Sequence, residues 1–292
     1  MSRFSRNEGL FGAEGQKLIS ATTVAICGLG GLGSHLAQQL VYLGVRRFIL
    51  IDFDVVTNTS LNRLIGAVEA DVIAATPKIE VAARLILAVR PDAEISKEPV
   101  RVADPAAEAL LAEADIIFGC LDKDVHRLEL MAIAADRQTP YFDLASDVVG
   151  EGEERYYGGR VVLCDGRGCL VCLPEVLDRE AIARERLDPA QAEVHRRIYG
   201  IDEDALEGTG PSVVSINGVV ASLAVTEFAV MVTGLRSPVV QLTYRADCGV
   251  VTKSADRGDS DCLYCDGFSG SRGADAEATD RGPSPQSHPP GH

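Results

Sequence analysis

The feature that most constrains this chain is a glycine-rich turn between a short apolar run and an apolar helical pattern. Residues 24–27 read Val-Ala-Ile-Cys, and residues 28–33 read Gly-Leu-Gly-Gly-Leu-Gly, which fits the spacing G-x-G-x-x-G. A helical pattern over 32–43 and a second β-type run over 47–52 follow. Strand, glycine turn, helix and strand in this order predict a βαβ unit.

Helices and strands continue to alternate after this unit. We expect further elements at 78–89 (helix), 98–102 (strand), 106–112 (helix) and 114–120 (buried strand). This alternation predicts a doubly wound, mostly parallel α/β sheet of Rossmann type, with helices on both faces.

The second half of the chain changes from alternating helices and strands to mainly β-type segments. Its β-type segments lie at 141–145, 160–164 and 241–245. We expect them to extend the sheet with mixed strands, so that residues 1–266 form one domain with a β-rich second half. A charged helical insertion is expected at 175–204, as a solvated helix face or a grip for a protein partner. Residues 267–292 are rich in Gly, Ser, Asp and Pro, which predicts a disordered tail.

Charge and cysteine usage exclude several classes of function. The formal net charge is −15, which argues against nucleic-acid and membrane-surface partners, because binding to phosphates needs a basic face. The N-terminus is polar and lacks the apolar run of a secretion signal. We therefore expect a cytoplasmic protein whose eight cysteines are thiols or metal ligands.

One apolar stretch, at 212–235, resembles a membrane span in length. It contains Asn217 and Glu227 and has no flanking basic cluster. These features favour a long buried helix over a span.

The glycine turn predicts a nucleotide site. Its glycines let the backbone approach a phosphate chain, and the helix that follows supplies donors and a positive field at its N-terminus. Asp52 ends the second β-type run, where a carboxylate binds ribose hydroxyls. These residues alone leave NAD and ATP both open.

Two basic residues further along favour ATP. Arg63 and Lys78 have no role in hydride transfer, whereas nucleotidyl transfer needs cations beside the phosphates to stabilise the charge on the departing pyrophosphate. If only one of the two residues were present, a surface salt bridge would be the preferred explanation for it.

Together these motifs resemble the ThiF/MoeB/HesA superfamily of ubiquitin-activating-like adenylyltransferases, over nearly the whole chain up to the tail. The matching segments are Arg3-Phe4-Ser5-Arg6, Gln16, the glycine turn, Asp52-Phe53-Asp54, Leu61-Asn62-Arg63, Pro77-Lys78 and Asp122. The chain departs from the usual pattern at Ser60, Leu64 and Lys123, and the segment between Arg63 and Lys78 is slightly longer. These changes leave the ionic positions intact.

The resemblance implies that the chain uses MgATP to adenylate the C-terminal carboxylate of a ubiquitin-like protein ending in glycine. It implies that Asp52 binds the ribose, that Asn62, Arg63 and Lys78 bind the phosphates, and that Asp122 binds magnesium. Arg6 would act from the partner subunit of a homodimer. The expected ATP-site residues are Gly28, Gly30, Gly31, Gly33, Asp52, Asp54, Arg63, Lys78 and Asp122.

Two C-x-x-C pairs form the second strong motif. Cys169 and Cys172 make the first pair, and Cys262 and Cys265 make the second. In a reducing compartment they supply the four thiolates that a closed structural zinc site requires. Such a site has no open coordination position, so we assign it no catalysis. The resemblance agrees with this assignment.

The remaining cysteines bear on the fate of the activated carboxylate. Cys27 and Cys120 end buried strands and are best read as core residues. Cys164 and Cys248 lie near strand ends, where packing is favoured but a thioester role stays open. Residues 173–211 contain no cysteine. The chain therefore stops at the adenylate or passes the acyl group to a thiol on a separate conjugating enzyme or sulfur donor.

Three other functions compete with this reading. An enzyme of the same fold can adenylate a small-molecule carboxylate, a peptide carboxylate or a tRNA nucleoside. A non-catalytic module can bind ATP and recruit a partner through the charged insertion. A dehydrogenase can bind NAD. Two pathways use this chemistry, sulfur transfer for cofactor synthesis and a bacterial ubiquitin-like conjugation system. The absence of a cysteine from residues 173–211 favours conjugation.

Overall fold

The computed structural model describes residues 3–149, 155–174, 176–186, 212–256, 258–259 and 261–269. These residues form one eight-stranded sheet in the order β3-β2-β1-β4-β5-β6-β7-β8. The strands are β1 (Thr23–Cys27), β2 (Arg47–Ile51), β3 (Glu94–Glu98), β4 (Ile116–Gly119), β5 (Tyr141–Val149), β6 (Tyr156–Cys164), β7 (Gln241–Arg245) and β8 (Val250–Lys253).

The two halves of the sheet differ in strand direction. Strands β3, β2, β1, β4 and β5 run parallel, and β5 to β8 pair antiparallel. The predicted fold class, a mostly parallel doubly wound sheet extended by mixed strands, is confirmed.

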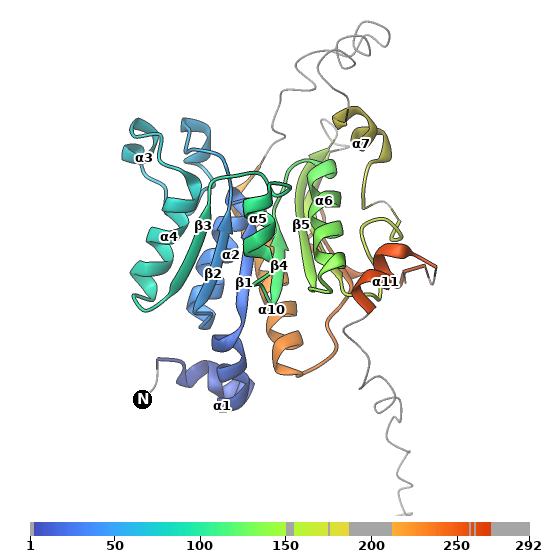
Figure 1. Ribbon diagram of the computed structural model, residues 1–292, viewed down its shortest axis with the longest axis horizontal. Coiled ribbons are helices and arrows are strands. Elements are labelled where there is room, and N and C mark those ends of the chain that lie inside the picture. The colour runs from blue at the N-terminus through green and yellow to red at the C-terminus, as the bar shows by residue number, and fades with distance from the viewer. Residues whose placement is uncertain are drawn as a thin grey trace, which may run out of the picture.

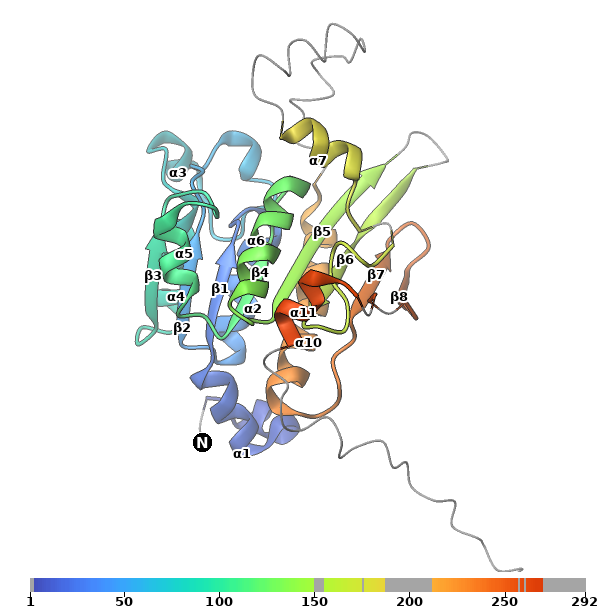
Figure 2. The ribbon, with the colours of Figure 1, turned by 45° about the vertical axis from the view of Figure 1, so that its right-hand side comes forward.

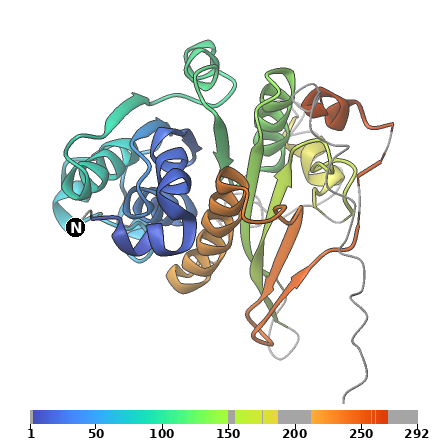
Figure 3. The same ribbon diagram turned by 90° about the horizontal axis from the view of Figure 1, so that it is seen from below.

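Helices cover both faces of the sheet (Figures 1 and 3). They are α1 (Ser5–Ala21), α2 (Gly31–Leu43), α3 (Glu69–Ile73), α4 (Lys78–Val89), α5 (Pro105–Leu111), α6 (Asp124–Asp136), α7 (Arg179–Glu185), α10 (Val214–Thr233) and α11 (Leu263–Ser269), with a 3-10 turn at Asn58–Ser60. One apolar core lies between the sheet and α2, α4 and α10. A second core lies on the opposite face, beneath α5, α6 and α11.

Helix α10 is the element that the sequence suggested as a buried helix. It is the one helix among the described residues that is long and apolar enough to cross a membrane, and 56% of its apolar window is buried. Val220, Ala224 and Phe228 pack in the first core against the sheet. The buried Glu227 carboxylate is paired with Arg236 at 2.6 Å. The apolar composition of α10 thus reflects contacts with the protein interior.

Several element boundaries differ from the sequence prediction. The strand expected at 98–102 lies instead at Glu94–Glu98, since Pro99 has no N–H to donate to a ladder. Strands β5 and β6 run nine residues each, longer than expected. Helices α1 and α6 and strand β8 were not predicted. All four residues of β8 are exposed, so the strand lacks the alternating burial that marks a strand in sequence.

The last described helix crosses the predicted boundary between the domain and the tail. Phe268 is 1% exposed and packs in the second core, and α11 runs to Ser269. Helix α11 therefore continues past residue 266, after which the predicted tail begins. The rest of the predicted tail, 270–292, lies outside the described residues, as does most of the predicted helical insertion, whose described part includes α7.

Candidate functional site

The glycine turn lies at the switch point of the sheet. From β1 the chain continues to β2 on one side, and β4 pairs with β1 on the other side. The carboxyl ends of β1, β2 and β4 lead into Gly28, Asp52 and Cys120 respectively. These three strands lie side by side in the sheet (Figure 2). Open α/β sheets bind ligands outside the carboxyl ends of their strands at such a switch point.

Close packing explains three of the four glycines in the turn. Gly28 has φ +86°, and a Cβ there would lie 2.5 Å from the backbone oxygen of Cys120. A Cβ on Gly33 would overlap the backbone oxygen of Gly28, and one on Gly31 would overlap the Nδ2 atom of Asn217. A Cβ on Gly30 meets no atom within 4 Å. The turn is therefore tightly seated, and its outer edge at Gly30 faces open space.

Asp52 is fixed against this turn. Its side chain accepts hydrogen bonds from the backbone N–H of Leu29 at 2.5 Å and of Asp54 at 2.7 Å. The residue is 7% exposed, and burial raises the pKa of its carboxyl, against the opposing effects of Lys78 and the two N–H donors. A carboxylate held in this way keeps lone pairs for ribose hydroxyls beside the turn.

Lys78 lies at the start of α4 and pairs with Asp54. Its Nζ atom is 2.6 Å from Asp54 Oδ2, and its side chain is 16% exposed. An isolated β-bridge between Val55 and Pro77 ties the two segments together. A cation in the first turn of a helix opposes the helix dipole, so the pair with Asp54 stabilises Lys78 where phosphates are expected.

Arg63 lies beside the glycine turn. The N–H of Ile65 donates to Ser34 Oγ at 3.0 Å, which clips this segment to the first turn of α2. A Cβ on Gly31 would lie 3.4 Å from the Cδ atom of Arg63. The Arg63 guanidinium donates to Thr59 O at 2.6 Å and to Asn62 Oδ1 at 3.2 Å. Asn62 is exposed next to it.

Asp122 follows β4 at the same edge. It is exposed in the loop between β4 and α6, and no hydrogen bond or ion pair joins its carboxylate to any described residue. The N–H of Cys120 donates to Cys27 O at 2.8 Å, which holds this loop against the end of β1. An oxygen ligand for a hard cation is thus available beside the turn.

Arg6 and Gln16 lie elsewhere. Both belong to α1, where Asn7 and Gln16 donate to the carbonyl of Leu43 at the far end of α2. Figure 1 shows α1 at the opposite edge of the sheet from α3 and α7. The structure therefore brings the turn, Asp52, Asp54, Arg63 and Lys78 together with Asp122 at one edge, and leaves Arg6 and Gln16 of the same chain apart from them.

Asn217 packs against the glycine turn and is absent from the predicted site residues. It is 1% exposed in the first turn of α10, accepts from Ser146 Oγ at 2.8 Å and donates to Ser212 Oγ at 3.0 Å. Its amide packs directly on Gly31. The sequence signal for this residue is a polar side chain inside the apolar stretch 212–235, which indicates a buried partner as well as arguing against a membrane span.

The four paired cysteines form one cluster. Their ligand atoms all lie within 4.8 Å of one another, with sulfur–sulfur distances of 3.5 Å for Cys169–Cys172, 3.6 Å for Cys169–Cys262 and 3.5 Å for Cys172–Cys265. Four thiolates about 2.3 Å from a tetrahedral zinc ion lie about 3.8 Å apart, so the cluster fits such an ion. A hydrogen bond from Cys265 lowers the pKa of Cys169 to about 5. The cluster can therefore hold a metal ion.

The other cysteines differ in exposure. Burial raises the pKa of the Cys27, Cys120 and Cys164 thiols, and Cys164 is 0% exposed. These thiols are poor nucleophiles. Cys248 is exposed in the turn between β7 and β8, with β5 and β6 between its hairpin and β4.

Comparison with known proteins adds independent information. A model of the ThiF family matches residues 4–252. The molybdopterin-synthase adenylyltransferase of Escherichia coli (strain K12) is 29% identical over 184 residues, which cover 62% of this chain and 71% of that protein. The tRNA threonylcarbamoyladenosine dehydratase of Bacillus subtilis (strain 168) is 30% identical over 141 residues, 48% of this chain and 55% of that protein.

A solved structure supports the fold. E. coli MccB with ATP superposes with a TM-score of 0.67 at 21% identity, over 91% of this chain and 75% of that chain. At this identity the likeness concerns the arrangement of helices and strands.

Proposed function

The chain belongs to the ThiF family, whose model spans residues 4–252, and from this premise we propose that it adenylates the C-terminal carboxylate of a ubiquitin-like protein with MgATP. Adenylyltransferases among its relatives support the enzyme class. The observation that carries the proposal is the convergence of the glycine turn, Asp52, Arg63, Lys78 and Asp122 at one edge of the sheet.

The proposed reaction is an attack by a carboxylate oxygen on the α-phosphorus of ATP. A new P–O bond forms, the bond to the pyrophosphate oxygen breaks, and the products are an acyl-adenylate and pyrophosphate. The carboxylate is ionised at neutral pH and needs no general base. Arg63 and Lys78 stabilise the negative charge that moves onto the pyrophosphate.

Asp122 is the residue that would hold magnesium. Its carboxylate is exposed at the carboxyl edge of β4 and is bonded to no described side chain, which suits an oxygen ligand for this ion. When bound, magnesium supplies positive charge beside the phosphates. Asp52 orients the ribose from the opposite side of the turn.

The acyl group passes to another protein in this proposal. Cys164 is buried, and the exposed Cys248 lies on a distant hairpin, so neither thiol suits the transfer. A conjugating enzyme or a sulfur donor is the expected acceptor. The two pathways that use this chemistry are ubiquitin-like conjugation in bacteria and sulfur transfer for cofactor synthesis.

Three further properties belong to the proposal. The cysteine cluster holds structural zinc, the protein works as a homodimer with Arg6 supplied in trans, and it resides in the reducing cytoplasm. Thiolate ligands for zinc persist where disulfides do not form.

Pyrophosphate exchange tests the substrate. The protein is mixed with ATP, magnesium, labelled pyrophosphate and one carboxylate at a time: a ubiquitin-like protein ending in glycine, the same protein with an amidated C-terminus, a short peptide and small acids. The proposal expects label in ATP only with the free C-terminal glycine. Exchange with a peptide or a small acid would replace the ubiquitin-like substrate, and ATP binding without exchange would indicate a binding module.

One relative supports a second candidate. The Bacillus subtilis relative is named as a tRNA threonylcarbamoyladenosine dehydratase. A tRNA-borne carboxylate is therefore a further arm of the same assay. The net charge of −15 argues against tRNA as a partner, and exchange with tRNA alone would decide for it.

A further inference from the structure

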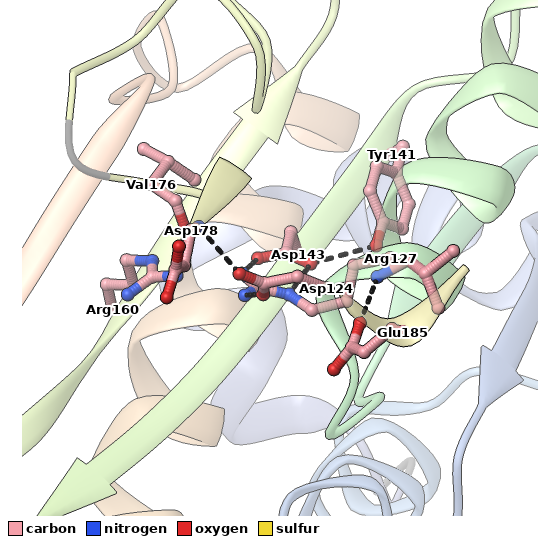
Figure 4. Close-up of polar contacts among 9 residues, drawn as sticks. Asp124, Arg127, Tyr141, Asp143, Arg160, Val176, Asp178 and Glu185 are labelled. Atoms are coloured by element: carbon pink, nitrogen blue, oxygen red, sulfur yellow. Dashed lines mark hydrogen bonds and ion pairs between the residues drawn. The ribbon is translucent and has the colours of Figure 1, made fainter. Parts of the chain in front are cut away.

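A buried ion pair lies beside the loop that carries Asp122. Arg127 on α6 donates its Nε to Asp143 Oδ1 at 2.9 Å, and its Nη2 pairs with the other oxygen of Asp143 (Figure 4). Arg127 is 3% exposed and Asp143 is 0% exposed. Tyr141 also donates its hydroxyl to Asp143 Oδ1 at 2.9 Å. Strand β5 thus holds the guanidinium in one orientation.

Such a pair is costly to bury and is not needed merely to fill a core. A buried ion pair contributes little net stability over a well-packed apolar pair, because two charges must lose their water. The Arg fork, however, fixes direction as well as charge. With Nε and Nη2 bound to Asp143, the direction of the third nitrogen, Nη1, is fixed as well.

That nitrogen binds the start of α6. Arg127 Nη1 donates to Asp124 Oδ1 at 2.5 Å. Asp124 is the first residue of α6 and lies two residues after Asp122. The Asp122 side chain has no described partner of its own, so its direction depends on the backbone of this loop.

The same loop is held from the side by the segment that follows the first cysteine pair. Asp124 Oδ2 accepts from the backbone N–H of Asp178 at 2.7 Å, and Glu185 at the end of α7 accepts from Val125 N–H at 2.9 Å. Arg160 on β6 donates to the carbonyl of Val176 in this segment. Figure 4 shows these contacts gathered around Asp124 and Asp143.

We propose that Arg127 is a positioning residue, which through Asp124 orients the loop that presents Asp122 to magnesium and joins that loop to α7. The inference rests on the proposed function, because it takes Asp122 as the magnesium ligand. It goes beyond that function in assigning a role to residues that do not reach the nucleotide.

Metal binding gives a readout that a purely structural role does not move. Manganese replaces magnesium and is detected by electron paramagnetic resonance in the presence of a non-hydrolysable ATP analogue. We expect Arg127→Met to raise the manganese Kd about tenfold, while the Kd of the analogue without metal changes less than about twofold.

A matched control separates stability from positioning. Arg236 pairs through two nitrogens with the buried Glu227 at the far end of α10, away from the Asp122 loop. Arg236→Met leaves a buried carboxylate unpaired just as Arg127→Met does. We expect both variants to lower the Tm and only Arg127→Met to weaken manganese binding.

A second variant tests the inference in case Arg127→Met does not fold. The double variant Arg127→Met, Asp143→Asn removes both charges of the pair, so no unpaired charge stays buried, and Asp124 still loses its cation. It should show the same tenfold rise in the manganese Kd. Wild-type manganese affinity in this variant, or an equal loss in Arg236→Met, would overturn the inference.

The test is independent of the substrate. If the wild-type protein binds manganese with the analogue but exchanges pyrophosphate with no carboxylate, the proposed function fails and the positioning role still stands or falls by the manganese Kd. If Asp122→Ala leaves the manganese Kd unchanged, the positioning role fails because Asp122 is not the ligand.

Discussion

Asp122 contributes to the candidate site through a carboxylate that no described side chain binds. Its removal should therefore leave the fold intact and act on the chemistry. We expect Asp122→Ala to slow magnesium-dependent pyrophosphate exchange about 100-fold, because the charge beside the phosphates is lost. Asp122→Asn, which keeps the size, should fall nearly as far. Full exchange in Asp122→Ala would refute the assignment.

The glycines of the turn should differ in their tolerance of a methyl group. Gly33→Ala places a Cβ against the backbone oxygen of Gly28, and Gly31→Ala places one against the buried amide of Asn217. We expect each to lower the free energy of unfolding by about 1 to 3 kcal/mol, as overpacking does.

Gly30→Ala is the matched variant for this series, since a Cβ there meets nothing within 4 Å. Its unfolding midpoint in urea should stay close to that of the wild type. Adding Asn217→Ala to Gly31→Ala should recover part of the loss by clearing space. An equal loss in Gly30→Ala would contradict the close-packing account.

At the level of single residues, the sequence predicted those residues whose place depends only on their neighbours along the chain. The glycine turn, Asp52 and Lys78 each stand next to a strand end or a helix start, and the structure brings them together. Asn217 and the Arg127–Asp143 pair were missed, because their partners lie on other elements. Asp143 gave one available signal, a charge within a β-type run, which implies a buried partner.

Among the elements, the two cysteine-bearing segments meet in the cluster that is proposed to hold zinc. Cys169 and Cys172 precede α7, whereas Cys262 and Cys265 lie at the start of α11. We expect about one zinc per chain by elemental analysis. Chelation should lower the free energy of unfolding by about 4 kcal/mol if free zinc exceeds its Kd a thousandfold.

Cys262→Ser should abolish this response to chelator, whereas Cys248→Ser, at an exposed turn, should retain it. A metal-free protein with the same Tm before and after chelation would refute the structural role of the cluster.

The segment after Arg63 is fastened to α4 by a second ion pair. Asp71, 4% exposed, accepts from Arg84 at 2.9 and 2.7 Å, and this bonding lowers the pKa of Asp71 to about 2. Because the folded value lies below the ordinary value of 3.8, the pair contributes stability above pH 3.8 that is lost as the pH falls toward 2.

Denaturant unfolding of the wild type and Asp71→Asn across this range checks the effect. The variant should be less stable at pH 6, and the difference should shrink as the pH falls from 4 to 2. A difference that stays constant with pH would show that the pair does not titrate as described.

Helices and strands with a strong apolar periodicity were predicted well. Those that depend on contacts with other elements were not predicted. Helix α4 begins and ends where its apolar pattern does. Helix α1 contains a kink at Gly12, with φ +69°, and a weak apolar pattern, so its helical state depends on contacts with α2 and α10. Strand β8 forms only by pairing with β7.

At the scale of the whole molecule, the position of Arg6 bears on the proposed homodimer. Arg6 lies on α1 at the opposite end of the sheet from the glycine turn, so in the proposed homodimer it would act at the site of the partner subunit. We expect Arg6→Ala and Arg63→Ala each to be nearly inactive in exchange. Mixing them should restore about a quarter of the wild-type rate, since about half of randomly exchanged dimers are mixed and each has one intact site.

Exchange measured before and after mixing, with the mass in solution determined by light scattering, checks this prediction. No recovery despite confirmed subunit exchange, or a fully active Arg6→Ala, would remove Arg6 from the site.

The substrate is recognised by a surface to which residues from distant parts of the chain contribute. Short sequence motifs therefore do not predict its identity. The charged insertion was predicted as a solvated helix face or a grip for a protein partner, and residues 187–211 lie outside the described part of the chain. The family and the nucleotide site follow from motifs near the glycine turn, whereas the partner must be identified by its chemistry.

Intact mass spectrometry tests the central claim most directly. A ubiquitin-like protein ending in glycine is incubated with this protein, ATP and magnesium, with pyrophosphatase added to draw the reaction forward. The account predicts a mass increase of one adenylyl group (AMP less one water) on the C-terminal carboxylate, absent with Asp122→Ala and with an amidated substrate. An unmodified ubiquitin-like protein, under conditions in which a peptide or a small acid becomes adenylated, would contradict it.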